Sequence, residues 1–509
     1  MLSFIFKIWM SRALGAEVVG LYQIAFSVLM LLFTLTAGAP TVLSRKVAEA
    51  ASRGDTKRQN ALTTASLILG FGLSAVLCAV FYAFNSKLGF LFSDERCLPL
   101  FLIMLPTLIT STLYASFRSW FWGRKNFLAF SSTELLDEII KIILSIVFAG
   151  GIIATLDSAQ GIALALTVSD LACVLVLAII FFIAGGRITK PQGFGELIKG
   201  TIPLSATRII TTLTASLTAL IIPQMLVANG MSVAQATAEY GRVAGMAFPL
   251  IMAPVTLIAS LSVVLIPDIA QLRAKGELDT VRKKMSGAMT FSILVASLFF
   301  VLYLPLGRDI GAFLFNDEAA GEFVSYCSLL LYPVAISQAT TPMLNSLGKE
   351  KNTFFNSLIG AIFILPCIFF LPKFIGVYAM AVGSGGCFAI IAVLNLITLK
   401  KEVGAFSDVK KSFITVGFSI PLAILGMLTQ RLLSSVTGNI VTIIVLITYL
   451  GFFMFLFVTA FDIVDVAGYV KLLRPASIAS RKRRPQRGAA LRHNRSSDKK
   501  HSKRARAKR

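Results

Sequence analysis

Long apolar segments recur along the whole chain and are separated by short polar stretches. A helix needs about 20 mostly apolar residues to cross a bilayer, because lipid offers its backbone groups no partner. Thirteen segments meet this requirement: 21–44, 61–84, 98–120, 127–149, 160–183, 198–223, 243–266, 286–306, 325–346, 354–371, 376–399, 412–430 and 440–460. Residues 1–14 form a shorter apolar segment, about two-thirds of a crossing. The pattern predicts an all-α polytopic membrane protein with about 14 transmembrane helices.

Basic residues concentrate in every second loop of this arrangement. The loops 45–58, 121–126, 185–199, 268–284, 347–352 and 400–411 hold 21 Lys and Arg residues, whereas the intervening loops hold seven. Short cytoplasmic loops collect Lys and Arg, so the alternation places the richer set of loops in the cytoplasm. We therefore expect a multi-pass protein of the cell membrane whose N- and C-termini are both cytoplasmic.

Composition supports a membrane protein and locates an unusual net charge. Of the 509 residues, 56% are hydrophobic and 14% are charged, whereas about a quarter of the residues of a globular domain are charged. The net charge is +23, and the segment from Pro475 onward contributes 14 basic residues against the single acid Asp498. This segment predicts a disordered cytoplasmic tail attracted to anionic lipid head groups, with no specific nucleic-acid partner.

The side chains that usually carry catalysis or bind metals are scattered. The six cysteines lie in apolar runs with no CxxC pair, and both histidines, His493 and His501, lie in the tail. The chain contains no GxxxxGK[ST] and no HExxH motif. We therefore expect no metal site, no cofactor and no enzyme activity. An ion gradient, the membrane potential or the substrate gradient would have to drive any transport.

Two pairs of predicted cytoplasmic loops resemble each other at a nearly fixed offset. Gly54-Asp55 recurs as Gly276-Glu277, and the motif that begins at Gly123 recurs at Gly348. These loops follow the second and fourth helices of two successive six-helix units. Because each unit has an even number of helices, both insert in the same direction. The chain therefore predicts two parallel six-helix repeats, an arrangement that paired-lobe transporters use to hold substrate between the halves.

The repeat defines the expected domains. They are an N-terminal six-helix lobe at 1–184 with a short first helix, a cytoplasmic linker at 185–197, a C-terminal six-helix lobe at 198–400, two additional transmembrane helices within 401–474, and the basic tail at 475–509.

Ionisable residues at membrane depth gather in the middle of the chain. Such a residue costs about 2.5–3.5 kcal/mol or more to insert, so it marks a functional hypothesis. The fifth helix carries Glu134, Asp137, Glu138 and Lys141, the sixth carries Asp170 and the seventh carries Arg208, while Arg118 lies near the cytoplasmic end of the fourth. These groups could line one water-filled cavity or bind a coupling ion. The alternative is a set of ion pairs, such as Glu134 or Asp137 with Lys141, that lock helices together.

Two blocks of sequence resemble a known family. The stretch from Ser11 to Tyr22, with Ala37-Gly38-Ala39-Pro40 and Ser44-Arg45-Lys46-Val47-Ala48-Glu49, is similar to the opening of the polysaccharide-transporter and stage V sporulation protein B branch of the MOP flippase superfamily. The block from Phe117-Arg118-Ser119 through Gly123 to Lys141 resembles the fourth and fifth helices of that family. This chain departs from the family pattern at Ser119, Asp137, Glu138 and Lys141, and its first helix is short.

The resemblance implies movement of a lipid-linked, diphosphate-bearing saccharide, such as a cell-wall precursor, from the inner to the outer leaflet. A planar guanidinium binds phosphate oxygens in pairs and stays charged. Arg208 and Arg118 are therefore the candidate substrate-binding residues, with Arg12 and Arg45 near the mouth of the cavity.

Two other functions stay open from the sequence. A multidrug cation antiporter of the same superfamily would use Glu134, Asp137, Glu138 and Asp170 as proton, sodium or cation sites, although Arg208 at similar depth disfavours a cationic ligand. A membrane scaffold without transport activity would instead recruit partners through the basic tail.

Overall fold

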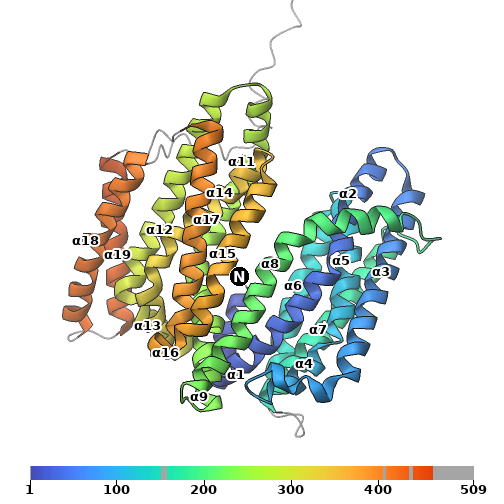
Figure 1. Cartoon of the computed structure of the whole chain (residues 1–509), viewed down its shortest axis with the longest axis horizontal. Coiled ribbons are helices and arrows are strands. Elements are labelled where there is room, and N and C mark those ends of the chain that lie inside the picture. The colour runs from blue at the N-terminus through green and yellow to red at the C-terminus, as the bar shows by residue number, and fades with distance from the viewer. Residues whose placement is uncertain (1, 151–156, 405–408, 435–438, 462, 464–509) are drawn as a thin grey trace, which may run out of the picture. The chain divides into compact units, whose positions relative to one another are not determined.

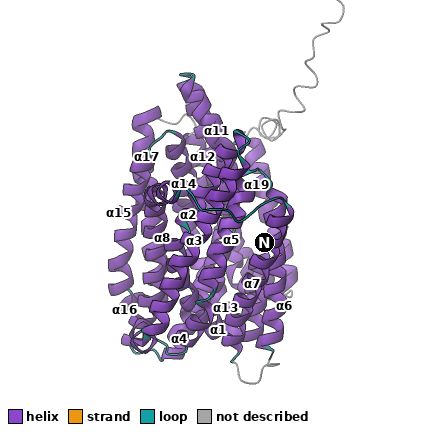
Figure 2. Cartoon of the chain, turned by 90° about the vertical axis from the view of Figure 1, so that its right-hand side faces the viewer, coloured by secondary structure: helices purple, strands orange, loops and turns teal. Residues whose placement is uncertain are grey.

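The structure, a computed structural model, describes residues 2–150, 157–404, 409–434, 439–461 and 463. Nearly all of these residues are helical and none lies in a strand (Figure 2). The chain divides into a compact unit from Met1 to Phe455 and a second unit from Leu456 to Arg509. The basic tail predicted at 475–509 lies outside the described residues.

The first half of the chain forms a bundle of seven α-helices within the described residues (Figure 1). They are α1 (Leu2–Thr36), α2 (Gly38–Ser52), α3 (Thr56–Ala83), α4 (Cys97–Met104), α5 (Thr107–Gly123), α6 (Phe127–Ala149) and α7 (Ser158–Ile183), with the 3-10 turns η1 (Asn85–Lys87) and η2 (Gly89–Leu91) between α3 and α4.

The second half begins with a long helix and contains more breaks. Its elements are α8 (Phe194–Ala228), α9 (Val233–Tyr240), the π-helix η3 (Gly241–Ala247), α10 (Phe248–Met252), α11 (Val255–Ala274), α12 (Leu278–Phe315), α13 (Glu318–Cys327), η4 (Ser328–Leu330), α14 (Leu331–Ser346), α15 (Glu350–Phe370), α16 (Pro372–Ile375), η5 (Gly376–Tyr378) and α17 (Ala379–Val403). The helices α18 (Val409–Ser434) and α19 (Asn439–Ala460) follow, and α18 packs on α12.

The first helix reverses direction at Gly15. This residue has φ 79° and ψ 174°, values that lie far outside the helical region and that only glycine adopts readily. The rings of Phe6 and Tyr22 lie 6.3 Å apart, whereas a straight helix between them would separate them by about 24 Å. The limb before Gly15 is therefore a separate short helix beside the longer limb, as the sequence predicts for residues 1–14.

The number of crossings differs from the sequence prediction. Eleven helices among the described residues are long and apolar enough to cross a membrane. The predicted count of about fourteen would be reached if α6 and the stretch from α9 to α11 each crossed the membrane once, and if the two limbs of α1 on either side of Gly15 counted as separate helices. The four ionisable residues of α6 exclude it on composition. In the other stretch, α9, the π-helix η3 and α10 are short, and α11, with 20 residues, is not among the eleven helices. The count of fourteen stays a prediction.

One predicted loop is mostly helical. The sequence places a cytoplasmic loop at 45–58, but α2 continues to Ser52 and the turn into α3 takes only Arg53 to Asp55. The apolar run before it is broken at Ala37, next to Gly38 and near Pro40, so α2 begins there as a separate amphipathic helix.

Corresponding helices of the two halves end in the same backbone turn. Gly54 after α2 has φ 70°, and its counterpart Gly276 after α11 has φ 77°. Lys125 after α5 has φ 59°, and Gly348 after α14 has φ 69°. These matches support the parallel repeat. They also show that Lys125, rather than Gly123, corresponds to Gly348, because a lysine adopts the left-handed conformation in the first half.

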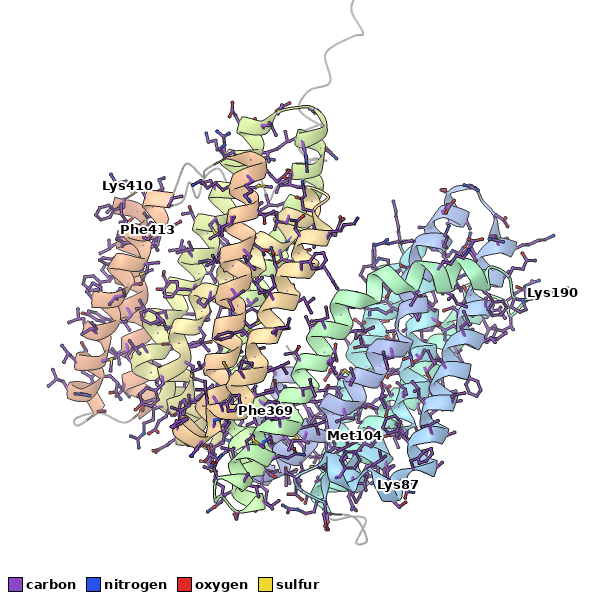
Figure 3. The ribbon with its side chains drawn as sticks, in the orientation of Figure 1. Lys87, Met104, Lys190, Phe369, Lys410 and Phe413 are labelled. Atoms are coloured by element: carbon purple, nitrogen blue, oxygen red, sulfur yellow. The ribbon has the colours of Figure 1, made fainter. Side chains whose placement is uncertain are left out.

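Within each half, residues predicted to be cytoplasmic lie at one end, and residues predicted to be near the external face lie at the other end. Figure 3 places Lys190, from the predicted linker, and Lys87, from the loop after α3, at opposite ends of the first bundle. In the second half Lys410 lies at the end away from Phe369.

A large apolar core joins helices from both halves, and a second core lies inside the first half. The first core includes Tyr22 of α1, Ile222 of α8 and Phe300 of α12. The second is built around Trp120, Phe121 and Phe181 and connects the ends of α5 and α7. Hydroxyl pairs such as Thr36 with Thr112, at 2.9 Å, satisfy polar groups between helices of the first half.

Candidate functional site

Arg208 of α8 and Thr41 of α2 connect the two halves of the molecule. The Nη1 atom of Arg208 lies 3.4 Å from the hydroxyl oxygen of Thr41. Arg45 lies four residues after Thr41 and therefore on the same face of α2. Both arginine side chains are exposed, and no carboxylate of the described residues pairs with either. The structure thus brings two of the predicted substrate-binding residues to one helix contact, where no carboxylate of the described part of the chain compensates their charges.

A cavity of about 320 Å³ lies between α1, α8, η3, α15 and α17. Its lining combines apolar side chains with hydroxyl groups, among them Ser27, Thr214, Tyr240 and Ser384, and it contains no charged residue. Thr211, one turn beyond Arg208 on the same face of α8, also lines this cavity. Arg208 therefore lies next to the rim of a neutral, hydroxyl-bearing cavity that both halves build.

Arg118 is held by an ion pair and by aromatic rings. Its Nη2 atom lies 3.0 Å from Oε1 of Glu134 on α6. Its guanidinium carbon lies 5.0 Å from the ring centre of Phe130 and 5.4 Å from that of Trp122. These contacts connect α5 to α6, as the ion-pair alternative from the sequence requires, although with Arg118 rather than Lys141 as the partner of Glu134. None of them involves Arg208.

The remaining charges of α6 form a second cluster. The Nζ atom of Lys141 lies 3.0 Å from Glu138 Oε1 and 3.8 Å from Asp137 Oδ2, and Ser3 donates a hydrogen bond of 2.8 Å to Glu138. One oxygen of Asp137 and one of Glu138 are buried without a hydrogen-bond partner among the described residues. The lysine therefore compensates this pair of carboxylates only in part.

Asp170 faces the same region from α7. Its Oδ2 atom accepts hydrogen bonds from Ser111 and, at 3.2 Å, from Thr110 on α5. A cavity of about 620 Å³ is lined by Glu134, Asp137, Glu138 and Asp170. The structure thus gathers the four carboxylates predicted for helices five and six around one cavity of the first half, with Lys141 and Arg118 as their cationic partners. Among the described residues no group of three potential ligands is arranged to hold a metal ion.

Arg12 lies far from Arg45. Its Nη1 atom donates a hydrogen bond of 2.8 Å to the backbone oxygen of Phe313, near the C-terminal end of α12. The chain reverses at Gly15 and then runs through the long limb of α1 that ends at Thr36, a length of about 30 Å. Because this limb separates them, Arg12 and Arg45 lie at different ends of the bundle and do not share a cavity mouth.

A polar contact at the end near Gly15 also connects the two halves, and the sequence did not indicate it. Arg96 pairs with Asp94 at 2.7 Å and with Glu17 of α1 at 2.6 Å. Thr237 of α9 donates a hydrogen bond of 3.3 Å to Asp94. Burial alone would raise the pKa of Asp94, but the hydrogen bonds from Arg96 and Thr237 and the charge of Arg96 hold that pKa below its ordinary value. The adjacent charges Asp94, Glu95 and Arg96 in a predicted external loop were the available signal.

The fold resembles that of one class of protein, the multi-pass transporters of the MOP superfamily. An inward-facing multidrug resistance MATE family transporter of the MOP superfamily aligns with a TM-score of 0.67 at 15% identity, over 79% of this chain and 94% of that one. The lipid II flippase MurJ, in an inward closed conformation, aligns with a TM-score of 0.69 at 15% identity, over 88% of this chain and 95% of that one.

The sequence narrows this class to one family. The chain belongs to the Polysaccharide biosynthesis protein family, whose profile matches residues 1–273. Stage V sporulation protein B of Bacillus subtilis (strain 168) is 27% identical over 420 residues, which are 78% of this chain and 79% of that protein. Sporulation protein YkvU of the same organism is 24% identical over 304 residues, 57% of this chain and 66% of that protein. These findings confirm the family resemblance of the sequence motifs.

Proposed function

We propose that this transporter moves a lipid-linked, diphosphate-bearing saccharide, a precursor of cell wall or polysaccharide, from the inner to the outer leaflet by alternating access. The observation that carries the proposal is the placement of Arg45 and Arg208 on two contacting helices from different halves, with no carboxylate of the described residues paired to either. Two guanidinium groups on facing helices suit a diphosphate, because each can donate paired hydrogen bonds to phosphate oxygens.

The neutral cavity beside Arg208 suits the remainder of such a head group. Hydroxyl side chains such as Ser27 and Thr214 can exchange hydrogen bonds with a saccharide. The apolar part of the lining, which includes Ile364 and Phe388, excludes competing charges. In this arrangement the diphosphate binds first near Arg45 and Arg208, and the saccharide enters the cavity between the halves.

The contact around Asp94, at the end of the bundle away from Arg45, supports alternating access. Asp94, Arg96 and Thr237 join the first half to α9, and the backbone of Gly241 packs directly on α1 near Ala16 and Gly20. Transport in this scheme requires these contacts to separate. The alternation of basic loops predicts that the Arg45 end is cytoplasmic, which corresponds to loading from the inner leaflet.

Arg118 and Arg12 receive different roles in this proposal. The pair of Arg118 with Glu134 positions α5 against α6, and the hydrogen bond of Arg12 to Phe313 attaches the short first limb to α12. Neither residue is then a direct ligand of the substrate.

The tail at 475–509 attracts anionic head groups of the inner leaflet.

The acidic cavity favours ion coupling as the source of energy. Asp137, Glu138 and Asp170 offer carboxylate oxygens to a proton or a sodium ion, and two of those oxygens are buried without a partner among the described residues. The same observation supports the second candidate function, an ion-coupled antiporter of multidrug cations, because the cavity is acidic.

Complementation of a bacterial strain that lacks its lipid-precursor flippase separates these functions. The flippase proposal predicts that the full-length chain restores growth without conferring drug resistance. Drug efflux that collapses when the membrane ion gradients are dissipated, together with failure to restore growth, would establish the antiporter instead.

A further inference from the structure

The structure contains a basic pocket at the predicted cytoplasmic end of the first half, separate from the arginine site. The pocket has a volume of about 990 Å³ and lies between the start of α3, the end of α5 and the segment after α7. Five basic residues line it: Lys57, Arg58, Arg124, Arg187 and Lys190. Figure 3 places Lys190 at the outer edge of the first bundle.

Most of this positive charge lacks a partner in the protein. Arg58 pairs with Glu196. No carboxylate of the described residues forms an ion pair with any of the other four basic residues. The only acidic residue in the lining is Asp55, which caps α3 by accepting the backbone N–H of Arg58 at 2.9 Å. The pocket is therefore suited to an anion.

Two buried polar atoms in the lining also lack partners. Trp120 is 2% exposed, and its Nε1–H donates to no described group. The hydroxyl of Thr189 is likewise buried and unpartnered among the described residues, although the backbone N–H of Thr189 donates to Thr64 at 3.1 Å. Buried donors are nearly always satisfied in folded proteins, by protein or by a bound group. Both residues belong to the lining that also carries the four basic residues without an ion pair, and this combination suits the oxygens of a phosphate group.

The pocket is built by rigid elements. The guanidinium carbon of Arg124 lies 4.3 Å from the ring centre of Trp120, and Trp120 packs against Phe181 with ring centres 4.8 Å apart. The segment after α7 is fixed to α3 by a hydrogen bond of 3.3 Å from the backbone of Gln192 to Ala61. The guanidinium of Arg124 and the backbone of the segment after α7 are therefore held in place before a ligand binds.

The surface beside the pocket is apolar and exposed. Phe182 is 52% exposed and Ile183 is 81% exposed, and they immediately precede Ala184 and Gly185, which line the pocket. In a membrane protein such side chains face acyl chains, and basic pockets at the cytoplasmic ends of helices bind anionic head groups. A free phosphate ion would not use this apolar surface, whereas a phospholipid would use both parts.

We propose that this pocket binds the phosphate-bearing head group of an anionic phospholipid of the cytoplasmic leaflet, with the acyl chains along the end of α7. The lipid phosphate accepts hydrogen bonds from Trp120 and Thr189 and pairs with Arg124 and Arg187. The site does not depend on the proposed transport substrate, because it lies outside the cavity beside Arg208.

The test uses the full-length protein in detergent, with binding measured by native mass spectrometry. The probes are phosphatidylglycerol, phosphatidylcholine and inorganic phosphate. The test variant is Arg187→Gln with Lys57→Gln, two exposed side chains. The control is Lys87→Gln with Lys373→Gln, which removes the same charge from exposed lysines in the predicted external loops.

The proposal predicts that phosphatidylglycerol binds the wild type and the control equally, and binds the test variant at least about tenfold more weakly. Equal binding of phosphatidylglycerol to the test variant and the control overturns it. So does equal binding of phosphatidylcholine and phosphatidylglycerol to the wild type. Displacement of phosphatidylglycerol by millimolar inorganic phosphate assigns the pocket to free phosphate and contradicts the lipid assignment.

A second variant tests the buried donor without changing charge. Trp120→Phe keeps an aromatic ring for Arg124 and removes the Nε1–H. We expect the preference for phosphatidylglycerol over phosphatidylcholine to fall severalfold while the melting temperature in phosphatidylcholine stays within a few degrees of the wild type. An unchanged lipid preference in Trp120→Phe would remove this donor from the site and contradict the proposed geometry.

Discussion

Arg208 and Thr41 lie 3.4 Å apart across the contact between α8 and α2, so one guanidinium of the second half reaches a hydroxyl of the first. Arg45 extends from the same face of α2. This relationship places two uncompensated cations where the halves of a paired-lobe transporter would have to move relative to one another. The charge, the contact and the adjoining neutral cavity together favour the binding of an anionic head group at this place.

Arg118 is expected to act through Glu134. Replacing Arg118 with Ala leaves Glu134 without its partner, and we expect transport to decrease severalfold. Adding Glu134→Gln removes the unpaired charge and should restore much of the activity, because an exposed ion pair of this kind contributes only about 0.2–1 kcal/mol. The measurement is a double-mutant cycle on transport rate and on melting temperature. Additive losses in the double variant would indicate instead that Arg118 contacts the substrate directly.

Asp170 is expected to control ion coupling. Asp170→Asn keeps the hydrogen-bond acceptor for Ser111 and Thr110 but cannot be ionised. We expect transport by this variant to lose its dependence on the proton or sodium gradient. Asp157→Asn at the start of α7 serves as the control, because Asp157 is exposed and makes no capping hydrogen bond through its side chain. A wild-type gradient dependence in Asp170→Asn would exclude Asp170 from coupling.

The contact of Asp94 with Arg96 and Thr237 is expected to become less stable in acidic solution. Its pKa is lower in the folded protein than the ordinary value of 3.8. Ionised Asp94 therefore stabilises the contact above pH 3.8, and this stabilisation is lost as the pH falls through the lower folded pKa. We expect the distance between labels on the 92–96 loop and α9 to stay constant between about pH 5 and 8 and to increase in more acidic solution.

Substitution of Asp94 tests the same contact at neutral pH. Asp94→Asn should increase the label distance there, because the pairs with Arg96 weaken. A distance in Asp94→Asn equal to that of the wild type would show that the contact does not hold the two halves together.

Close backbone packing is expected to make Gly241 sensitive to a single methyl group. A Cβ atom on Gly241 would lie 2.1 Å from the backbone oxygen of Ala16. Gly241→Ala should therefore separate η3 from α1 and destabilise the protein by about 1–3 kcal/mol. The control is Gly72→Ala on α3, where a Cβ meets nothing within 4 Å and where alanine stabilises a helix by about 1 kcal/mol. Melting temperatures that fall equally in both variants would contradict this packing.

The sequence predicted the elements that depend on local pattern. Apolar length predicted the helices, and the separate limb before Gly15 followed from the short apolar segment at residues 1–14. Charge alternation predicted which loops share an end, as Lys87 and Lys190 show within the first half. The family resemblance followed from short motifs near Arg12, Arg45 and Arg118, and the family profile confirms it over residues 1–273.

The arrangement of the site depended on tertiary packing that periodicity does not encode. The sequence makes Arg208 and Arg118 the candidate substrate-binding residues and puts Arg12 and Arg45 near the mouth of the cavity, but it does not show which of the four lie together. Only the reversal at Gly15 moves Arg12 to the end of α12, and only the packing of α6 on α5 gives Arg118 a carboxylate. The contact of Asp94 with Thr237 joins residues 143 positions apart, which no local spacing indicates.

The most direct test of the proposed function is outward movement of a labelled lipid-linked saccharide precursor in vesicles that contain the purified full-length protein. The test variant is Arg45→Ala with Arg208→Ala. The control is Arg53→Ala, an exposed arginine at the end of α2 that pairs only with Glu49 among the described residues. Hydrogen bonds to charged groups contribute about 1.5–3 kcal/mol each, so loss of both arginines predicts a decrease of at least about a hundredfold. Transport by the double variant at the rate of Arg53→Ala and of the wild type would contradict the proposed function.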